Sequence, residues 1–247
     1  MINIVLPIAG KGSRFLNAGY TLPKPLIPIH GKPMIEVVVN NVRPKTAHNF
    51  IFIALKEHLE HLGMRETLLN IAPGCSIISV DCVTEGAACT VLLATELINN
   101  ENQLMLVNSD QWVDIDINDY LEKIKLKSLD GLIMTMTAND SKWSYVGLDS
   151  NSLVNKVVEK QVISSEATVG IYNFRRGSDF VFAANKMIQK ELRVNGEFFV
   201  APVYNELISE NFKISFYNIG SEGDGMYGLG IPSDLDLFLN LPISKKL

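Results

Sequence analysis

The segment from Pro7 to Phe15, Pro-Ile-Ala-Gly-Lys-Gly-Ser-Arg-Phe, has the residue types needed to bind an anionic ligand. Gly10 and Gly12 allow a sharp turn that exposes backbone amides to an anion. Arg14 adds donors that can bind phosphate oxygens in pairs. A dinucleotide-binding fingerprint would need a third glycine at Phe15, and no Walker sequence is present, so the spacing excludes both of these common loops. Taken alone, the Gly-x-Gly pair is also compatible with an ordinary turn.

A lysine between two prolines follows this loop. Lys24 stands in Leu-Pro-Lys-Pro-Leu-Ile, ten residues after Arg14. Prolines stiffen the backbone on both sides, which holds the ammonium group in one place. A positioned cation of this kind is suited to neutralising charge that develops at a reacting phosphate. The two segments together predict a phosphate site.

The two motifs resemble those of the sugar-nucleotide pyrophosphorylases, a family of nucleotidyltransferases, and the resemblance covers nearly the whole chain. It implies that the loop binds the nucleoside triphosphate and that Lys24 approaches its α-phosphate. Arg14 and Lys24 are thus the expected catalytic residues. The nucleotide-binding residues implied in the loop are Pro7, Ala9, Gly10, Gly12, Ser13 and Arg14.

The segment Thr84-Glu-Gly-Ala87 lies between an apolar run and a helical pattern. It resembles the family segment that meets the nucleobase, which makes Glu85 and Gly86 candidates for base recognition. A second interpretation is a helix N-terminus, with Thr84 as its cap and Glu85 complementing the helix dipole. The two interpretations are compatible.

Asn108-Ser-Asp110 follows the apolar run Leu104–Val107. The carboxyl end of a strand is where α/β sheets bind ligands, and a carboxylate there can hold Mg²⁺ together with phosphates. The resemblance implies that Asp110 is a magnesium ligand and that Asn108 contacts the nucleotide, although Ser109 replaces the family's glycine. An Asx turn that closes the strand is the alternative.

Three later segments resemble the acceptor-binding side of the family. Lys160 ends Val-Glu-Lys, Gly170 lies in Thr-Val-Gly-Ile-Tyr, and Glu197 ends Asn-Gly-Glu. Each is weak alone, because an exposed Glu-Lys pair is usually only solvated. Their order along the chain supports the assignment of all three to the acceptor.

One motif departs from the family pattern. Where relatives read Asp-x-Gly-Thr-Pro, with the aspartate as a second metal ligand, this chain has Gly228-Leu-Gly-Ile-Pro232. Asp224 or Glu222, in a glycine-rich stretch expected to be flexible, are candidate substitutes. The missing carboxylate also leaves open a nucleotide-binding homologue that has lost catalysis.

Apolar runs alternate with helical patterns, which predicts an α/β fold with a Rossmann-like, mostly parallel central sheet flanked by helices. The resemblance adds a GT-A-like nucleotidyltransferase architecture with an acceptor-binding lobe. We expect one domain, residues 1–247, in which 1–140 bind the nucleotide and 141–247 the acceptor. The expected strands are 4–8, 50–55, 76–80, 104–107, 131–137, 143–148 and 168–174. The expected helices are 33–42, 56–71, 86–98, 177–191, 199–210 and 233–241.

Composition excludes several classes of protein. A net charge of −5 argues against a nucleic-acid partner. No apolar run is long enough to span a membrane, and the first residues read as a strand rather than a signal peptide. The three cysteines form no C-x-x-C pair, which indicates a reduced, cytoplasmic protein without a zinc site. The sequence leaves open whether the protein forms a homo-oligomer.

The function expected is Mg²⁺-dependent transfer of a nucleoside monophosphate from an NTP to a phosphorylated small molecule, with release of pyrophosphate. The acceptor is a sugar 1-phosphate or, as in the smaller capsule-associated relatives that the chain resembles, phosphocholine or phosphoglutamine. Such a product would serve surface polysaccharide synthesis. CTP, UTP and dTTP remain open as donors. A nucleotide-sugar-dependent glycosyltransferase is the alternative, with Asp114-Ile-Asp116 as its metal motif.

Overall fold

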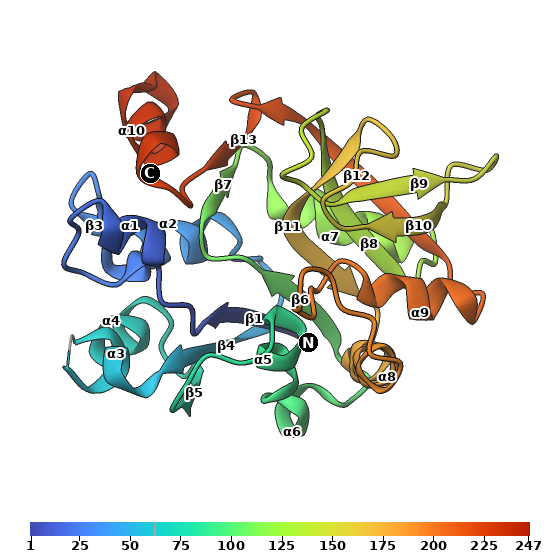
Figure 1. Cartoon of the computed structure of the whole chain (residues 1–247), viewed down its shortest axis with the longest axis horizontal. Coiled ribbons are helices and arrows are strands. Elements are labelled where there is room, and N and C mark those ends of the chain that lie inside the picture. Colours follow the sequence, from blue (N-terminus) through green and yellow to red (C-terminus); the bar gives the residue numbers. More distant parts are fainter. Residues whose placement is uncertain (62) are drawn as a thin grey trace.

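The computed structural model describes residues 1–61 and 63–247, and it is built around an eleven-stranded mixed sheet (Figure 1). In sheet order the strands are β5 (Ser76–Val80), β4 (His48–Leu55), β1 (Ile2–Ile8), β6 (Gln103–Val107), β11 (Glu166–Phe174), β8 (Gly131–Thr137), β12 (Ile214–Glu222), β13 (Gly225–Gly228) and β7 (Gln111–Val113). Two further strands, β9 (Tyr145–Leu148) and β10 (Val154–Val158), pair beside β11. A separate short hairpin joins β2 (Pro28–Ile29) to β3 (Lys32–Pro33).

The sheet is parallel in its N-terminal half and mixed beyond it. Strands β5, β4, β1 and β6 run parallel to one another. Strand β11 is antiparallel to both β6 and β8, and β8 pairs parallel with β12. The carboxyl ends of β1 and β6 therefore meet at one edge, so the loops that follow these strands lie close together.

Both faces of the sheet are buried. Side chains alternate along each strand, so each strand contributes to the apolar cluster on either face. In β1, Ile4 and Leu6 pack into one apolar cluster, and Val5 packs into the other. The first cluster is covered by α2 (Met34–Asn41), α3 (Lys56–His61), α4 (Met64–Ile71), α7 (Ile117–Leu126) and α10 (Pro232–Asn240). The second is covered by α5 (Ala87–Leu92), α6 (Thr95–Ile98), α8 (Gly177–Gln189) and α9 (Val203–Ser209).

The predicted α/β sheet flanked by helices is confirmed, and every predicted strand is present with bounds that differ by two residues at most. The prediction of one helix over 56–71 was wrong: α3 and α4 are separate, with Gly63 at a φ of 67° before α4. Position 62 of that predicted helix lies outside the described residues. The predicted helix 86–98 is likewise two helices, α5 and α6.

Several elements were not predicted, among them α7 and the strands β7, β10, β12 and β13. The stretch 220–230 was expected to be flexible, but it contains the end of β12 and all of β13, and β13 pairs with β7. In the part of the chain that the structure describes, no helix is both long and apolar enough to cross a lipid bilayer.

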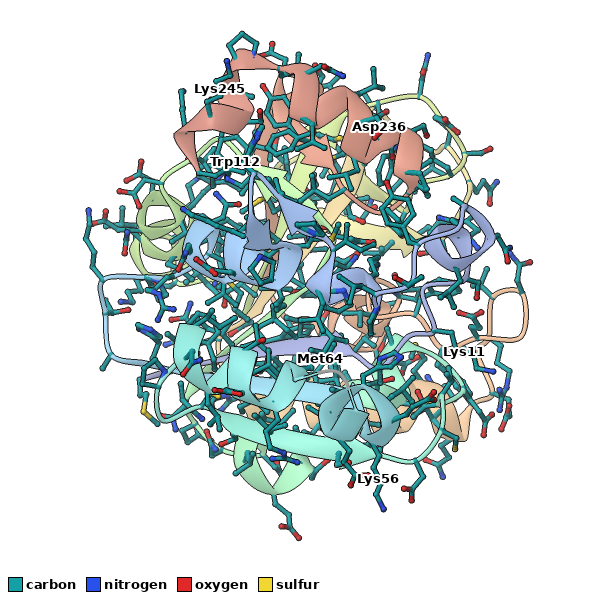
Figure 2. All side chains as sticks on the ribbon, turned by 90° about the vertical axis from the view of Figure 1, so that its left-hand side faces the viewer. Lys11, Lys56, Met64, Trp112, Asp236 and Lys245 are labelled. Atoms are coloured by element: carbon teal, nitrogen blue, oxygen red, sulfur yellow. The ribbon has the colours of Figure 1, made fainter. Side chains whose placement is uncertain are left out.

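The C-terminal helix packs across the N-terminal half of the chain. Trp112 of β7, labelled in Figure 2, has its ring 5.6 Å from that of Tyr227 and 5.8 Å from that of Phe238. These aromatic contacts hold α10 against β13 and β7. Beyond α10, a 3₁₀ turn, η2 (Pro242–Lys246), brings Ser244 to within 2.8 Å of His30. The segment 228–234 is thereby held beside the loops that follow β1 and β6.

Candidate active site

The glycine loop after β1 leads directly into the short helix α1 (Ser13–Asn17), and Gly12 is its N-terminal capping residue. Phe15 is buried and meets Tyr20 edge to face, which anchors the loop to the core. Pro7 and Gly12 are half-buried and Ala9 is buried, whereas Gly10, Ser13 and Arg14 are exposed. The loop thus presents its glycine and its basic side chain to solvent.

Lys24 lies against this loop. It begins a 3₁₀ turn, η1 (Lys24–Leu26), whose first residue is preceded by Pro23 in an extended conformation. A Cβ built on Gly12 would lie 3.3 Å from Lys24 Cβ, so a larger residue at position 12 would crowd the lysine. The two motifs that were predicted to share one phosphate site are therefore neighbours in space.

Asp110 forms an ion pair with Lys24. The Lys24 Nζ donates to Asp110 Oδ2 over 2.9 Å, and the two side chains are 22% and 30% exposed. Asp110 follows β6, so its position at the carboxyl edge of the parallel strands agrees with the sequence prediction. Its carboxylate contacts the lysine rather than closing an Asx turn.

A glycine and a backbone hydrogen bond shape the space around Asp110. A Cβ on Gly230 would lie 2.7 Å from Asp110 Oδ2, so the glycine leaves the space that the carboxylate fills. Leu229 N donates to the Asp110 carbonyl over 2.8 Å and holds the two segments together. Mg²⁺ prefers oxygen ligands and usually keeps water or phosphate in its shell. Among the described residues, no group of three or more His, Cys, Asp or Glu side chains could hold a metal alone.

Asp234 is a candidate that the sequence analysis missed. A Cβ on Gly228 would lie 3.1 Å from Asp234 Oδ2, so the first turn of α10 places a carboxylate beside the position of the missing aspartate. Burial raises the pKa of Asp234, and the nearby charges of Lys142 and Arg14 act in the opposite direction. Of the two substitutes named from the sequence, Glu222 pairs with Lys142 over 2.9 Å.

The other expected substitute, Asp224, lies in the turn between β12 and β13. Its backbone oxygen accepts from Ser221 N over 2.6 Å, and its backbone nitrogen donates to the Ser221 carbonyl. These contacts give Asp224 a role in the turn. The structure brings Asp234, rather than Asp224, to the edge of Gly228.

Glu85 and Gly86 lie at the start of α5, but the predicted cap was wrong. Gly86 is the capping residue, and the Thr84 hydroxyl instead donates to the Gly86 carbonyl over 2.9 Å. The Glu85 side chain is 68% exposed and pairs with Arg193 over 2.6 Å. No pattern of spacing in the sequence indicated this partner.

Asn108 contacts the strand that carries Gly170. Asn108 N donates to the Gly170 carbonyl over 2.9 Å, and a Cβ on Gly170 would overlap the Asn108 amide group. A residue assigned to the nucleotide and one assigned to the acceptor are thus in contact. They join the end of β6 to β11.

The remaining acceptor candidates lie around a half-buried glutamate. Lys160 is exposed, with its Nζ 5.0 Å from the centre of the Phe199 ring. The neighbouring Glu159 accepts a hydrogen bond from Ser144. Burial raises the pKa of Glu159, and the charge of Glu197 acts in the same direction. Lys160, Glu159 and Glu197 therefore belong to one region.

The Asp114-Ile-Asp116 segment has other contacts. Asp116 caps α7 by accepting from Asn118 N over 2.9 Å, and it pairs with Lys45 over 3.3 Å. Hydrogen bonds from Asn118 lower the pKa of Asp116. Asp114 lies 3.9 Å from Lys246. Each aspartate of this segment therefore faces an exposed lysine.

The chain matches a known protein family over most of its length. The family model described as nucleotidyl transferase matches residues 2–200. D-glycero-alpha-D-manno-heptose 1-phosphate guanylyltransferase of Campylobacter jejuni is 23% identical over 95% of this chain and 97% of its own length. A bifunctional protein GlmU of Methanococcus aeolicus is 24% identical over 85% of this chain, which spans about half (48%) of that protein.

Among solved structures, a nucleoside-diphosphate-sugar pyrophosphorylase from Vibrio cholerae superposes with a TM-score of 0.81 at 26% identity. The match covers 98% of this chain and 100% of that one. The inositol-1-phosphate CTP transferase of T. maritima shares the fold, with a TM-score of 0.74 at 13% identity. The chain spans about half the length of three curated relatives it matches (48%, 49% and 48%). This chain belongs to the nucleotidyl transferase family.

Proposed function

We propose that the protein transfers a nucleoside monophosphate from an NTP to a phosphorylated small molecule and releases pyrophosphate. The observation that carries the proposal is the Lys24–Asp110 ion pair, which lies beside the glycine loop. A cation and a carboxylate next to a phosphate-binding loop are the charges that phosphoryl chemistry requires. The C. jejuni relative is named as a guanylyltransferase of a sugar 1-phosphate, which supports the same class of reaction.

The nucleotide is held by the loop and by Lys24. The amides around Gly10 and Gly12, with the hydroxyl of Ser13, receive phosphate oxygens. Arg14 binds the two phosphates that depart as pyrophosphate, and Lys24 neutralises charge at the α-phosphate. Asp110 would hold Mg²⁺, which would neutralise charge on the phosphates.

The acceptor approaches from the other side of the site. Lys160 binds its phosphate, and Glu197 and the strand at Gly170 contact the rest of the molecule. An oxygen of the acceptor phosphate attacks the α-phosphorus in line, and the bond from that phosphorus to the β-phosphate oxygen breaks. A phosphate oxygen is already deprotonated near neutral pH, so no side chain has to remove a proton. In this arrangement 1–140 form the nucleotide-binding part, and 141–247 form the acceptor-binding part of the one domain.

The acceptor is a sugar 1-phosphate or a phosphorylated amine such as phosphocholine or phosphoglutamine, and its product serves surface polysaccharide synthesis in the cytoplasm. Glu85 and Gly86 contact the base, and Asn108 contacts the nucleotide. GTP is tested as a donor alongside CTP, UTP and dTTP, because relatives that the chain matches are named as guanylyltransferases.

The experiment has two stages. Each nucleotide is first tested with Mg²⁺ by thermal shift, because a ligand of the native state raises the apparent stability. Every nucleotide that stabilises the protein is then incubated with glucose 1-phosphate, mannose 1-phosphate, phosphocholine or phosphoglutamine, and pyrophosphate is measured. The proposal expects pyrophosphate only when both substrates are present. Stabilisation by a nucleotide without turnover, on this panel and on a wider set of phosphomonoesters, would instead support an inactive nucleotide-binding homologue.

A further inference from the structure

The loop that carries Glu85 and Gly86 is joined through its backbone to a loop much later in the chain. Phe198 N donates to the Glu85 carbonyl over 2.9 Å, and Ala88 N donates to the Phe198 carbonyl over 3.0 Å. A Cβ on Gly86 would lie 2.5 Å from Phe198 N, and Gly86 has a φ of 138°. Only glycine allows this approach, so the two backbones are in direct contact.

Arg193 connects the side chains of the same two loops. Its Nη1 lies 2.6 Å from Glu85 Oε2, and its guanidinium carbon lies 4.1 Å from the centre of the Phe198 ring. The Nε also meets Glu191 Oε2 at 2.7 Å. An exposed ion pair alone contributes little. Here the planar guanidinium also stacks on a buried ring, which defines its orientation.

The later loop is a tight hairpin that includes Glu197. Val194 and Glu197 exchange two backbone hydrogen bonds of 3.0 Å. Asn195 and Gly196 between them have φ values of 49° and 83°, as in a two-residue turn with positive φ at both positions. Arg193 Nη1 donates to the Gly196 carbonyl over 3.2 Å, which ties the arginine to the same turn. Because Phe198 follows Glu197 directly, the position of Glu197 depends on the contact with Gly86.

We propose that Arg193 is a positioning residue that couples nucleotide binding to acceptor binding by holding the 193–198 hairpin against the Glu85–Ala88 loop. The inference rests on the proposed function, which places the base beside Gly86 and the acceptor beside Glu197. Each ligand then orders a contact that the other also needs. Such coupling is reciprocal: each substrate raises the affinity for the other by the same factor.

The first test uses nucleotide alone and hydrogen exchange as its readout. The backbone amides of Phe198 and Ala88 report on the contact between the two loops, because each donates a hydrogen bond across it. In the wild type, a nucleotide that binds with Mg²⁺ slows exchange of residues 193–198 by about 5-fold or more. Arg193→Met abolishes that slowing while the amides of β4 stay protected. The matched control is Arg175→Met, which removes an arginine paired with Asp130 at 3.9 Å, and it leaves the slowing unchanged.

The outcomes separate the two proposals. If none of the nucleotides binds, the proposed function fails, and the coupling that rests on it fails with it. If nucleotide binds and protects residues 193–198 equally in the wild type and in Arg193→Met, the coupling is overturned while the proposed function stands.

The second test exchanges the charges of the ion pair. Glu85→Arg and Arg193→Glu each place like charges together, so each raises the KM of the acceptor about 5-fold or more with a smaller change in kcat. The double variant restores an attractive pair and is expected to recover part of that KM, measured at saturating nucleotide, as a coupled pair requires. Recovery is incomplete because the contacts of Arg193 with Glu191 and with the Phe198 ring are not restored. Glu101→Arg, at an exposed glutamate near Arg176, is the control and leaves the KM unchanged. A double variant whose acceptor KM is no lower than that of the worse single variant would overturn the proposed coupling.

Discussion

Lys24 Nζ and Asp110 Oδ2 lie 2.9 Å apart and join the segment between the prolines to the end of β6. Each group satisfies the charge of the other at a half-buried position. In the proposed reaction both are needed elsewhere, the lysine at the α-phosphate and the carboxylate at the metal. In that reaction, binding of the nucleotide with its metal would replace this ion pair with two new charge contacts.

Removal of the lysine tests its part in this exchange. Lys24→Ala is expected to lower kcat/KM by about 10²-fold or more, or roughly 2.7 kcal/mol, as for loss of a positioned charge at the transition state. The free energy of unfolding, measured in urea, should fall modestly, because the partly buried Asp110 carboxylate loses its partner. Lys45→Ala is the matched control, because Lys45 pairs with Asp116 at 3.3 Å and is 81% exposed. Normal turnover of Lys24→Ala would contradict the assigned role.

Arg14 is tested through the departing pyrophosphate. Arg14→Ala is expected to lower kcat/KM by about 10²-fold and, in the reverse reaction, to raise the KM of pyrophosphate. Arg14 is exposed, so folding should be unaffected. Steady-state assays in both directions measure the effect, with Arg175→Ala as the control. An unchanged KM for pyrophosphate would assign Arg14 to another part of the site.

The metal is tested at Asp110 and Asp234. We expect Mg²⁺ to bind weakly to the protein alone and better with the nucleotide, whose phosphates complete its shell. Asp110→Asn should lower activity, with partial recovery at raised Mg²⁺, and Asp234→Asn should weaken Mg²⁺ binding in the presence of nucleotide. Calorimetric titration of Mg²⁺ with and without nucleotide measures both. Micromolar binding without nucleotide would show that the protein supplies a more complete site than we propose.

Gly230 provides a steric test of the same carboxylate. In Gly230→Ala the new Cβ would lie 2.7 Å from Asp110 Oδ2, so the carboxylate must move. Activity should fall, and the effect should vanish in the Asp110→Asn background if it acts through that side chain. The double-mutant cycle on kcat/KM provides the measurement. Additive effects of the two substitutions would mean that Gly230 acts independently of Asp110.

The parts of the site that the sequence could predict are those that depend on local pattern. An uninterrupted apolar strand followed by a glycine loop places Arg14, and a second buried strand places Asp110 at the same sheet edge. Helix α7 was not predicted, although its pattern is present in the sequence. Asp116 caps it, and apolar side chains follow at helical spacing; these are Ile117, Tyr120, Leu121 and Ile124.

What could not be predicted depends on contacts between distant segments. The approach of Asp234 to Gly228 requires that α10 pack on Trp112, which in turn requires the pairing of β13 with β7. The contact between Arg193 and Glu85 requires the backbone of Phe198 to lie on Gly86. Neither packing nor strand order is contained in the spacing of residues along the chain.

The pH dependence of stability tests the burial of Glu159. Burial raises the pKa of this carboxyl, and the hydroxyl of Ser144 and the charge of Lys160 oppose that shift. A raised pKa in the folded state gives stability that is complete below the unfolded value, about 4.3, and is lost as pH rises through the folded value. Glu159→Gln cannot ionise, so its unfolding free energy relative to the wild type should increase between pH 4 and pH 7. Urea unfolding at both values provides the measurement.

The matched control for this prediction is Glu101→Gln, at a glutamate whose side chain is 79% exposed. Its unfolding free energy relative to the wild type should be nearly the same at both pH values. An equal difference at both pH values for Glu159→Gln would show that its carboxyl is solvated in the folded protein.

The fate of the α-phosphate tests the central claim most directly. The protein is incubated with Mg²⁺, an NTP labelled with ³²P at the α-position, and an acceptor whose phosphate carries ¹⁸O. The account predicts that ³²P and ¹⁸O appear together in one acceptor-linked diphosphate and that unlabelled pyrophosphate is released in equal amount. Lys24→Ala should form both about 10²-fold more slowly. Label that stays in the NTP, or that appears as free nucleoside monophosphate regardless of the acceptor, would contradict it.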